Sequence, residues 1–170
     1  MTPSFIKPSV LYHASESKTI KEFEPKNWTK RDSKEGPVVF ATSDKAYASM
    51  FIVPSDDSWT LKGRYGDKSS VYAWHIIVNG RDRFTNVDKG GSIYNLPVES
   101  FSYDVNRNMA DIEWTSQIPV RPKGQTNYKS GLEAMKKLGI KVYFVNDQTF
   151  NAIKKASDHG QSIISGLISD

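Results

Sequence analysis

The chain has 170 residues, 38% of them hydrophobic and 25% charged, with a formal net charge of +4, so it is long enough to bury a core of its own. It has no cysteine and three histidines, which excludes disulfides, a thiol nucleophile and cysteine-based metal sites and disfavours a multi-histidine metal site. No signal-peptide pattern opens the chain and no apolar run approaches a membrane span of about 20 residues, so we expect a cytoplasmic protein with no membrane partner.

The first half of the chain predicts two strands followed by a helix. Residues 9–15 and 37–42 are short apolar runs, separated by a polar segment that ends at Gly-Pro. Ser43 or Asp44 can then cap a helix in which Ala46, Tyr47, Met50 and Phe51 recur at helical spacing. Residues 54–69 read as an exposed loop.

The second half predicts four strands and two helices. Strands are expected at 70–78, 98–103, 112–120 and 140–145, with a loop at 79–92. Leu132, Met135 and Leu138 mark an amphipathic helix that stops at Gly139. A last helix, capped by Asp147, is expected to end at Gly160.

About six strands and three or more helices, not regularly interleaved, indicate an α+β fold rather than a doubly wound parallel sheet. We expect one domain over residues 1–160, followed by a frayed tail over residues 161–170. The motifs GxxxxGK[ST], GxGxxG, HExxH and GxSxG are all absent, so the chemistry must be sought in less regular patterns.

The first candidate site is Leu-Tyr-His-Ala-Ser at residues 11–15. Alternate side chains of a strand share a face, so His13 and Ser15 are expected to point the same way. Small Ala14 would let a ligand approach the backbone while the imidazole forms a hydrogen bond to it. The alternative is a core histidine that is bonded to a neighbouring loop.

The second and third candidates are an aromatic ring and an acid. Tyr47 follows the hydroxyls of Thr42 and Ser43 and could stack on a flat ligand ring, or it could be a half-buried tyrosine after a helix cap. Glu113 opens an apolar strand, where a carboxylate could bind a sugar hydroxyl or stabilise a cationic sugar carbon. The alternative is a charge that protects an edge strand.

In order and spacing, these pieces resemble the ADP-ribosyltransferase superfamily. The branch concerned has a His-Tyr-Glu triad and includes poly-ADP-ribose polymerases, diphtheria-like toxins and RNA 2′-phosphotransferases. The first-strand motif resembles residues 11–15, the second strand and its helix resemble residues 40–51, and the late strand resembles residues 113–116. The resemblance spans about residues 9–120. It implies a split mixed and antiparallel β-sheet core with flanking helices.

The resemblance also implies NAD as a substrate and an ADP-ribosyl acceptor that is a protein or a nucleic acid. His13, Tyr47 and Glu113 would be the catalytic residues: the imidazole would bind ribose and the NAD amide, the phenol would stack on nicotinamide, and the carboxylate would stabilise an oxocarbenium-like ribose. The cofactor-binding set would be His13, Ala14, Ser15, Thr42, Ser43 and Tyr47. No metal is implied.

Three departures from the family pattern leave alternatives open. Ala14 stands where the family usually has glycine, and Gln117 would occupy the acid position if the strand register differed; Tyr65 and Tyr72 could substitute for Tyr47. One alternative function is a non-catalytic nucleotide-binding module on the same fold. The other is a nucleic-acid-binding protein that uses cations and aromatic residues of the middle of the chain: Lys62, Arg64, Lys68, Arg81, Arg83, Trp59, Tyr65 and Phe84.

Overall fold

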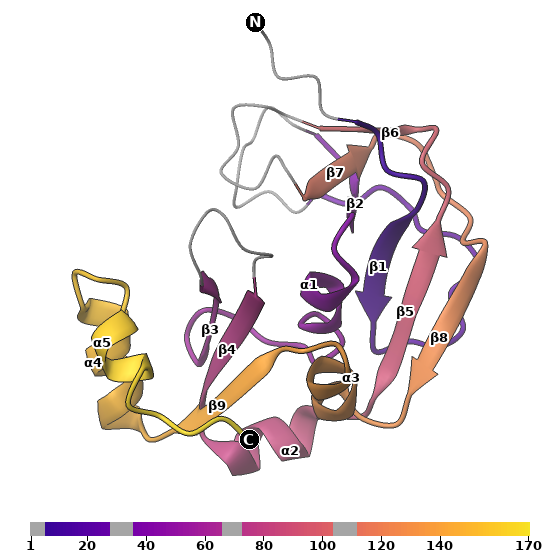
Figure 1. Ribbon diagram of the computed structural model, residues 1–170. Coiled ribbons are helices and arrows are strands. Elements are labelled where there is room, and N and C mark those ends of the chain that lie inside the picture. Colours follow the sequence, from indigo (N-terminus) through magenta and orange to yellow (C-terminus); the bar gives the residue numbers. More distant parts are fainter. Residues whose placement is uncertain (1–5, 28–35, 66–72, 104–111) are drawn as a thin grey trace, which may run out of the picture.

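The computed structural model describes residues 6–27, 36–65, 73–103 and 112–170. In this part of the chain, nine strands form two separate β-sheets, accompanied by five helices (Figure 1). The sequence-based prediction of an α+β fold is therefore confirmed.

The first sheet is antiparallel throughout, and its strand order is β6-β7-β2-β1-β5-β8. Its strands are β1 (Leu11–Ser15), β2 (Val39–Thr42), β5 (Gly91–Leu96), β6 (Phe101–Ser102), β7 (Glu113–Ser116) and β8 (Gly124–Tyr128). In the second sheet the central strand pairs antiparallel on one side and parallel on the other, in the order β3 (Thr60–Tyr65), β4 (Ala73–Asn79) and β9 (Lys141–Val145).

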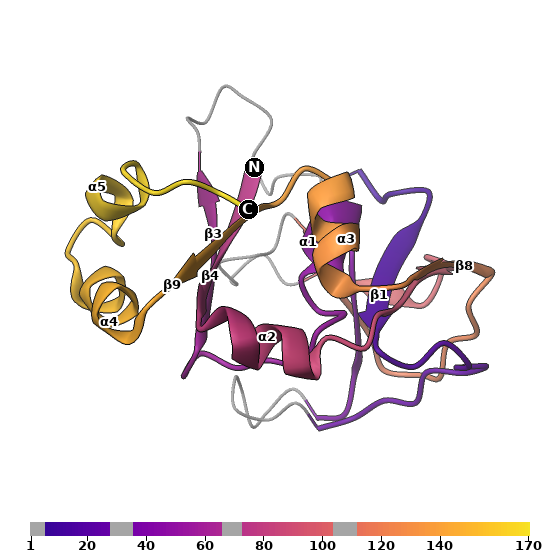
Figure 2. The ribbon, with the colours of Figure 1, turned by 90° about the horizontal axis from the view of Figure 1, so that it is seen from below.

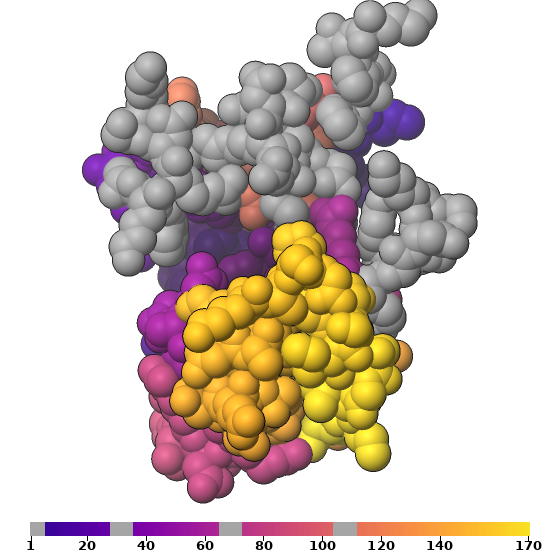
Figure 3. Space-filling view, turned by 90° about the vertical axis from the view of Figure 1, so that its left-hand side faces the viewer, coloured from indigo at the N-terminus to yellow at the C-terminus, as the bar shows by residue number. Residues whose placement is uncertain are grey.

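The helices fill the space between the sheets and cover the outer face of the second one. They are α1 (Lys45–Ser49), α2 (Arg81–Val87), α3 (Gly131–Lys137), α4 (Asp147–Lys155) and α5 (Gln161–Ile164). Helices α1 and α3 lie between the two sheets, whereas α4 and α5 lie on the far side of the second sheet (Figures 1 and 2). Seen from that side, α4 and α5 form the front of the molecule (Figure 3).

The hydrophobic core follows this layering. We call its largest part the central cluster; it joins the second sheet to α1 and α3 and comprises Met50, Val53, Trp59, Trp74, Ile76, Val78, Phe84, Ile112, Met135, Ile140 and Val142. A second cluster covers the face of the first sheet that carries Leu11, Val39 and Tyr94. Phe150 of α4 and Ile164 of α5 close the outer face of the second sheet.

Five elements, β3, α2, β5, β8 and α5, were not predicted from the sequence, and β3 and α2 lie in the segments 54–69 and 79–92 that were expected to be loops. Strand β3 contains Lys62, Gly63 and Arg64 and has no apolar alternation, so it depends on its pairing with β4. Helix α2 buries only Phe84 and therefore shows no helical periodicity. Strand β5 is buried on both faces and β8 is exposed at four of its five residues, so neither alternates.

The segment after Gly160 is packed, which corrects the expectation of a frayed tail. Its first residues form α5, in which Ile164 is buried. The backbone N–H of Asp170 donates to the carbonyl of Val142 in β9, at 2.8 Å. The tail thus lies against the second sheet, because apolar side chains at helical spacing give it a face to bury.

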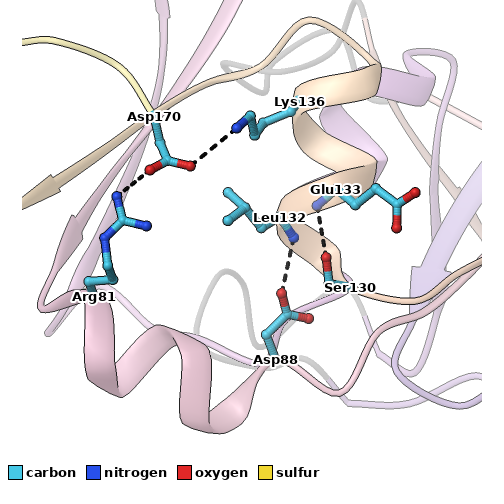
Figure 4. A network of polar contacts seen from close by, with 7 residues as sticks. All are labelled: Arg81, Asp88, Ser130, Leu132, Glu133, Lys136 and Asp170. Atoms are coloured by element: carbon cyan, nitrogen blue, oxygen red, sulfur yellow. Dashed lines mark hydrogen bonds and ion pairs between the residues drawn. The ribbon is translucent and has the colours of Figure 1, made fainter.

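Two aspartates join α2, α3 and the tail (Figure 4). Asp88, which follows α2, accepts hydrogen bonds from the first two backbone N–H groups of α3, at 2.6 and 3.1 Å. The Asp170 carboxylate lies between the Arg81 guanidinium and the Lys136 ammonium, the latter at 3.3 Å. Because the first N–H groups of a helix have no partner within it, the Asp88 carboxylate stabilises the start of α3 as well as linking it to α2.

Gly63 makes room for a buried histidine in the second sheet. It lies directly opposite His75, and a Cβ atom at position 63 would be 2.7 Å from His75 Nε2. We expect Gly63→Ala to lower the free energy of unfolding by about 1–3 kcal/mol, as overpacking usually does. Gly124→Ala is the matched control, since its Cβ would meet nothing closer than 3.9 Å. Urea unfolding measures both, and equal stability of the two variants would contradict the packing argument.

Candidate functional site

Three side chains from adjacent strands form a row on one face of the first sheet. Tyr12 of β1 lies opposite Thr42 of β2, and Thr42 lies opposite Glu113 of β7. Residues that pair directly across strands share a face, so all three point the same way. Tyr12 packs against the buried cluster that includes Ala48 of α1, and this is therefore the face that α1 covers.

Tyr47 and Glu113 meet at this face although they are far apart in the sequence. The Tyr47 hydroxyl donates to Glu113 Oε1 at 3.0 Å, in a partly buried setting. The Tyr47 ring also lies 4.6 Å from the Trp74 ring of β4 and 5.0 Å from the Phe51 ring, measured between centroids. The pair therefore lies where the first sheet, α1 and the second sheet come together.

Asp44 holds the start of α1, the helix that carries Tyr47, in place. One of its carboxylate oxygens accepts from the Tyr47 backbone N–H at 3.1 Å and so caps α1. The other accepts from the indole N–H of Trp74 at 2.7 Å. One side chain thus links the end of β2 to the second sheet. Of the two caps that the sequence allowed, Ser43 and Asp44, the structure uses Asp44.

A cavity of about 550 Å³ opens beside Asp44. Tyr12 and Trp74 provide aromatic surface to its wall, and Ser43 and Lys45 provide a hydroxyl and a cation. The Lys45 ammonium lies 5.8 Å from the centre of the Tyr12 ring. The volume is that of a small-molecule site, and the lining combines two aromatic rings with one carboxylate, that of Asp44, and one ammonium, that of Lys45. Tyr47 and Glu113 are not among the lining residues; Trp74 is the residue that contacts both the cavity and the Tyr47 ring.

His13 does not join the Tyr47–Glu113 pair. It follows Tyr12 in β1, so its side chain points to the opposite face of the sheet. There its ring packs 4.5 Å from the Phe23 ring, and Nδ1 lies 2.6 Å from the carbonyl oxygen of Phe40. This matches the alternative of a core histidine bonded to a neighbouring segment. Burial lowers the pKa of His13, which the hydrogen bond to Phe40 opposes and the charge of Lys26 reinforces.

The other predicted binding residues have local roles in the structure. Ala14 is buried against the α1 side of the sheet, and Ser15 Oγ accepts from the Ser17 N–H at 3.1 Å. Thr42 is buried, and its hydroxyl accepts from the Asp44 N–H at 3.0 Å. Ser43 is the one of these residues that lines the cavity.

The structure also bears on the alternatives for the acid. Glu113 is the first residue of β7 and meets Tyr47, whereas Gln117 lies past the end of β7 and is exposed. Strand β7 lies between β6 and β2; Glu113 pairs with Thr42 of β2, whereas β6 pairs with Thr115 and Ser116 of β7. Tyr72 and the side chain of Tyr65 lie outside the described residues.

The aromatic residues proposed as a nucleic-acid footprint are mostly core. Trp59 and Phe84 are buried in the central cluster, so neither offers a free face to a base. Arg83 lies over the Trp59 ring at 4.4 Å, and Arg81 is bound to Asp170. Lys68 lies outside the described residues.

Two cations of this expected footprint, Lys62 and Arg64, instead lie over the two rings that contact Tyr47. The Lys62 ammonium lies 5.2 Å from the centre of the Phe51 ring, and the Arg64 guanidinium lies 4.8 Å from that of the Trp74 ring. Tyr12, Asp44, Lys45 and Trp74 were not selected from the sequence as ligand-contacting residues. The sequence did contain a signal for Tyr12. It is the neighbour of His13 in a strand, so its side chain must lie on the opposite face of the sheet from His13.

No protein-family model, curated protein or solved structure matches this chain. Within the described ranges, no three histidine or acidic side chains gather closely enough to hold a metal ion. No helix in that part of the chain is both long enough and apolar enough to cross a lipid bilayer.

From the lowered pKa of the partly buried His13 we predict a stability that depends on pH. Because its pKa is lowered in the folded state, the unfolded chain binds more protons near pH 6, and stability falls as the pH drops below the unfolded pKa of about 6.5. His75, whose pKa burial also lowers, acts in the same direction. We expect the melting temperature to fall between pH 7.5 and 5, and His13→Gln to reduce this slope.

Thermal unfolding at several pH values measures the effect, with the exposed His159→Gln as the matched control. A slope unchanged in His13→Gln would show that the imidazole titrates as it does in the unfolded chain.

Proposed function

We propose that the protein cleaves the bond between nicotinamide and ribose in NAD and transfers ADP-ribose to an acceptor, with Glu113 as the catalytic carboxylate. The observation that carries the proposal is the 3.0 Å hydrogen bond that joins Tyr47 and Glu113, near a cavity to which Trp74, a neighbour of the Tyr47 ring, contributes. These are two of the three residues that the resemblance to ADP-ribosyltransferases selects. The division of the fold into two sheets is also in keeping with that resemblance.

The chemistry requires a fixed negative group near the reacting sugar. As the glycosidic C–N bond breaks, its electron pair leaves with nicotinamide, and positive charge develops at the ribose carbon. A carboxylate that already points at this carbon stabilises the charge without reorganising. The Tyr47 hydroxyl, held by the capped helix, fixes the orientation of Glu113. A nucleophilic oxygen or nitrogen of the acceptor, or water, then attacks the same carbon and loses a proton.

A second candidate is a nucleotide-binding module without turnover. The position of His13 favours it, because a residue expected to bind ribose is buried against Phe23 on the opposite face of the sheet. Ala14 favours it as well, since its methyl group stands where the family usually has glycine. Both candidates place NAD in the same region, and they differ in whether the glycosidic bond breaks.

We expect the protein to release nicotinamide from NAD and Glu113→Gln to reduce the rate about 10²–10³-fold, the usual effect of removing one preorganised stabilising group. Tyr47→Phe should cause a smaller loss, because it leaves the carboxylate in place but less well oriented. Chromatographic detection of free nicotinamide measures the rates. Glu133→Gln on the exposed side of α3 is the matched control and should keep full activity.

The same samples separate the two candidates. A rise in melting temperature with NAD but no nicotinamide release would support the binding module and reject the enzyme. Neither a shift nor release would reject both.

A further inference from the structure

Lys62 and Arg64 point toward the space between the sheets from the edge strand of the second sheet. Lys62 pairs with Ile76 and Arg64 with Trp74, and both partners belong to the central cluster. Paired residues share a face, so the two cations lie on the side of β3 that faces α1 and Tyr47. Strand β3 is the outer strand of its sheet in the described part of the chain.

Each cation is one aromatic ring away from Tyr47. Lys62 lies over Phe51 and Arg64 over Trp74, and both rings are within 5.0 Å of the Tyr47 ring between centroids. Tyr47 in turn is bonded to Glu113. On the side of the second sheet, one aromatic ring therefore separates each of two positive groups from the Tyr47 ring.

We propose that Lys62 and Arg64 bind the phosphate groups of a nucleotide diphosphate whose sugar lies at Glu113. This inference rests on the proposed function, and it assigns the anionic half of the substrate to two residues of β3. In NAD, the ribose that bears nicotinamide also carries a phosphate on its 5′ carbon. A ribose held at Glu113 therefore carries the diphosphate directly on its own 5′ carbon.

The geometry of the strand suits two linked phosphates. Side chains two residues apart on one face of a strand are separated by about 6.6 Å. Guanidinium groups bind phosphate through two parallel N–H donors while stacking on an aromatic ring, and ammonium groups act as mobile point charges. A lysine and an arginine at this spacing can therefore each serve one end of a diphosphate.

The surroundings of Lys62 leave its charge only partly compensated. Its ammonium donates to Ser55 Oγ at 3.2 Å, and it feels the negative charges of Asp56 and Asp57, both of which are exposed. Burial nevertheless lowers the pKa of Lys62 overall, because these acids offset only part of the cost of desolvation. A bound phosphate would supply the missing negative charge at shorter range.

A graded set of ligands tests the assignment: nicotinamide riboside has no phosphate, nicotinamide mononucleotide has one and NAD has two. We expect the affinity to rise along this series. Lys62→Gln and Arg64→Gln should each weaken NAD binding about tenfold or more while leaving nicotinamide riboside binding unchanged. Lys62→Arg keeps the charge and should retain most of the affinity, whereas Arg64→Lys keeps the charge but loses the two parallel donors and should retain only part of it.

Arg83→Gln is the matched control. It removes a cation from over a tryptophan, Trp59, which precedes the other end of β3. If the cations of β3 serve only to cover aromatic rings, all three glutamine variants will lower the melting temperature alike and leave NAD affinity unchanged, which overturns the inference. Folding is verified by the melting temperature of each variant without ligand.

The outcomes distinguish this inference from the proposed function. Unchanged NAD affinity in the β3 variants overturns the phosphate assignment even if nicotinamide is released. Inorganic pyrophosphate that stabilises the original protein, but not the β3 variants, supports the phosphate site even if NAD is not cleaved. A loss confined to the binding of a single-stranded oligonucleotide would overturn the nucleotide assignment in favour of a polymer.

Discussion

The arrangement depends on one carboxylate, that of Asp44. It caps α1 through one oxygen and accepts the Trp74 indole N–H through the other, so it fixes the start of the helix to the second sheet. A partly buried carboxylate is costly unless it is bonded, and here each of its two oxygens accepts one hydrogen bond. These two hydrogen bonds fix where α1 begins, and Tyr47 lies in its first turn. From there Tyr47 contacts Glu113 and Trp74, and Trp74 also lines the cavity.

The period of a β-strand explains why the candidate residues separate. Tyr12 and His13 are neighbours in β1, so one faces α1 and the other faces the cluster around Phe23. Glu113 shares its face with Tyr12 because both pair with Thr42. The face covered by α1 therefore carries the acid and the phenol, and the Tyr47 ring contacts Trp74, which lines the cavity. The imidazole lies on the opposite face, where burial lowers its pKa and so favours its neutral form.

The strongest sequence patterns correspond to real elements. The apolar runs that became β1, β2, β4 and β9 were identified because each is short and nearly continuous, and α3 was identified because its apolar residues recur at helical spacing. Strand β5 is buried on both faces as β4 is, but glycine, serine and asparagine interrupt its apolar residues; β8 is largely exposed and α2 buries one residue, so none of the three shows such a pattern. The helix expected between Asp147 and Gly160 exists as α4, but Asn146 rather than Asp147 caps it, and it ends at Lys155 rather than at Gly160. Local hydrogen bonding, not hydrophobic pattern, decides between two adjacent polar residues.

The sequence by itself determined the α+β class, the helix after β2 and the residues from which a site could be built, because these depend on local spacing and capping. It could not determine which of those residues meet. Tyr47 and Glu113 come together through the β2–β7 register and the Asp44 link, whereas His13 is turned away by the alternation of β1. The other residues near the site come together only because the two sheets enclose α1. They are Tyr12 of the first sheet and Lys62, Arg64 and Trp74 of the second. Such contacts are set by long-range packing, which no window of neighbouring residues records.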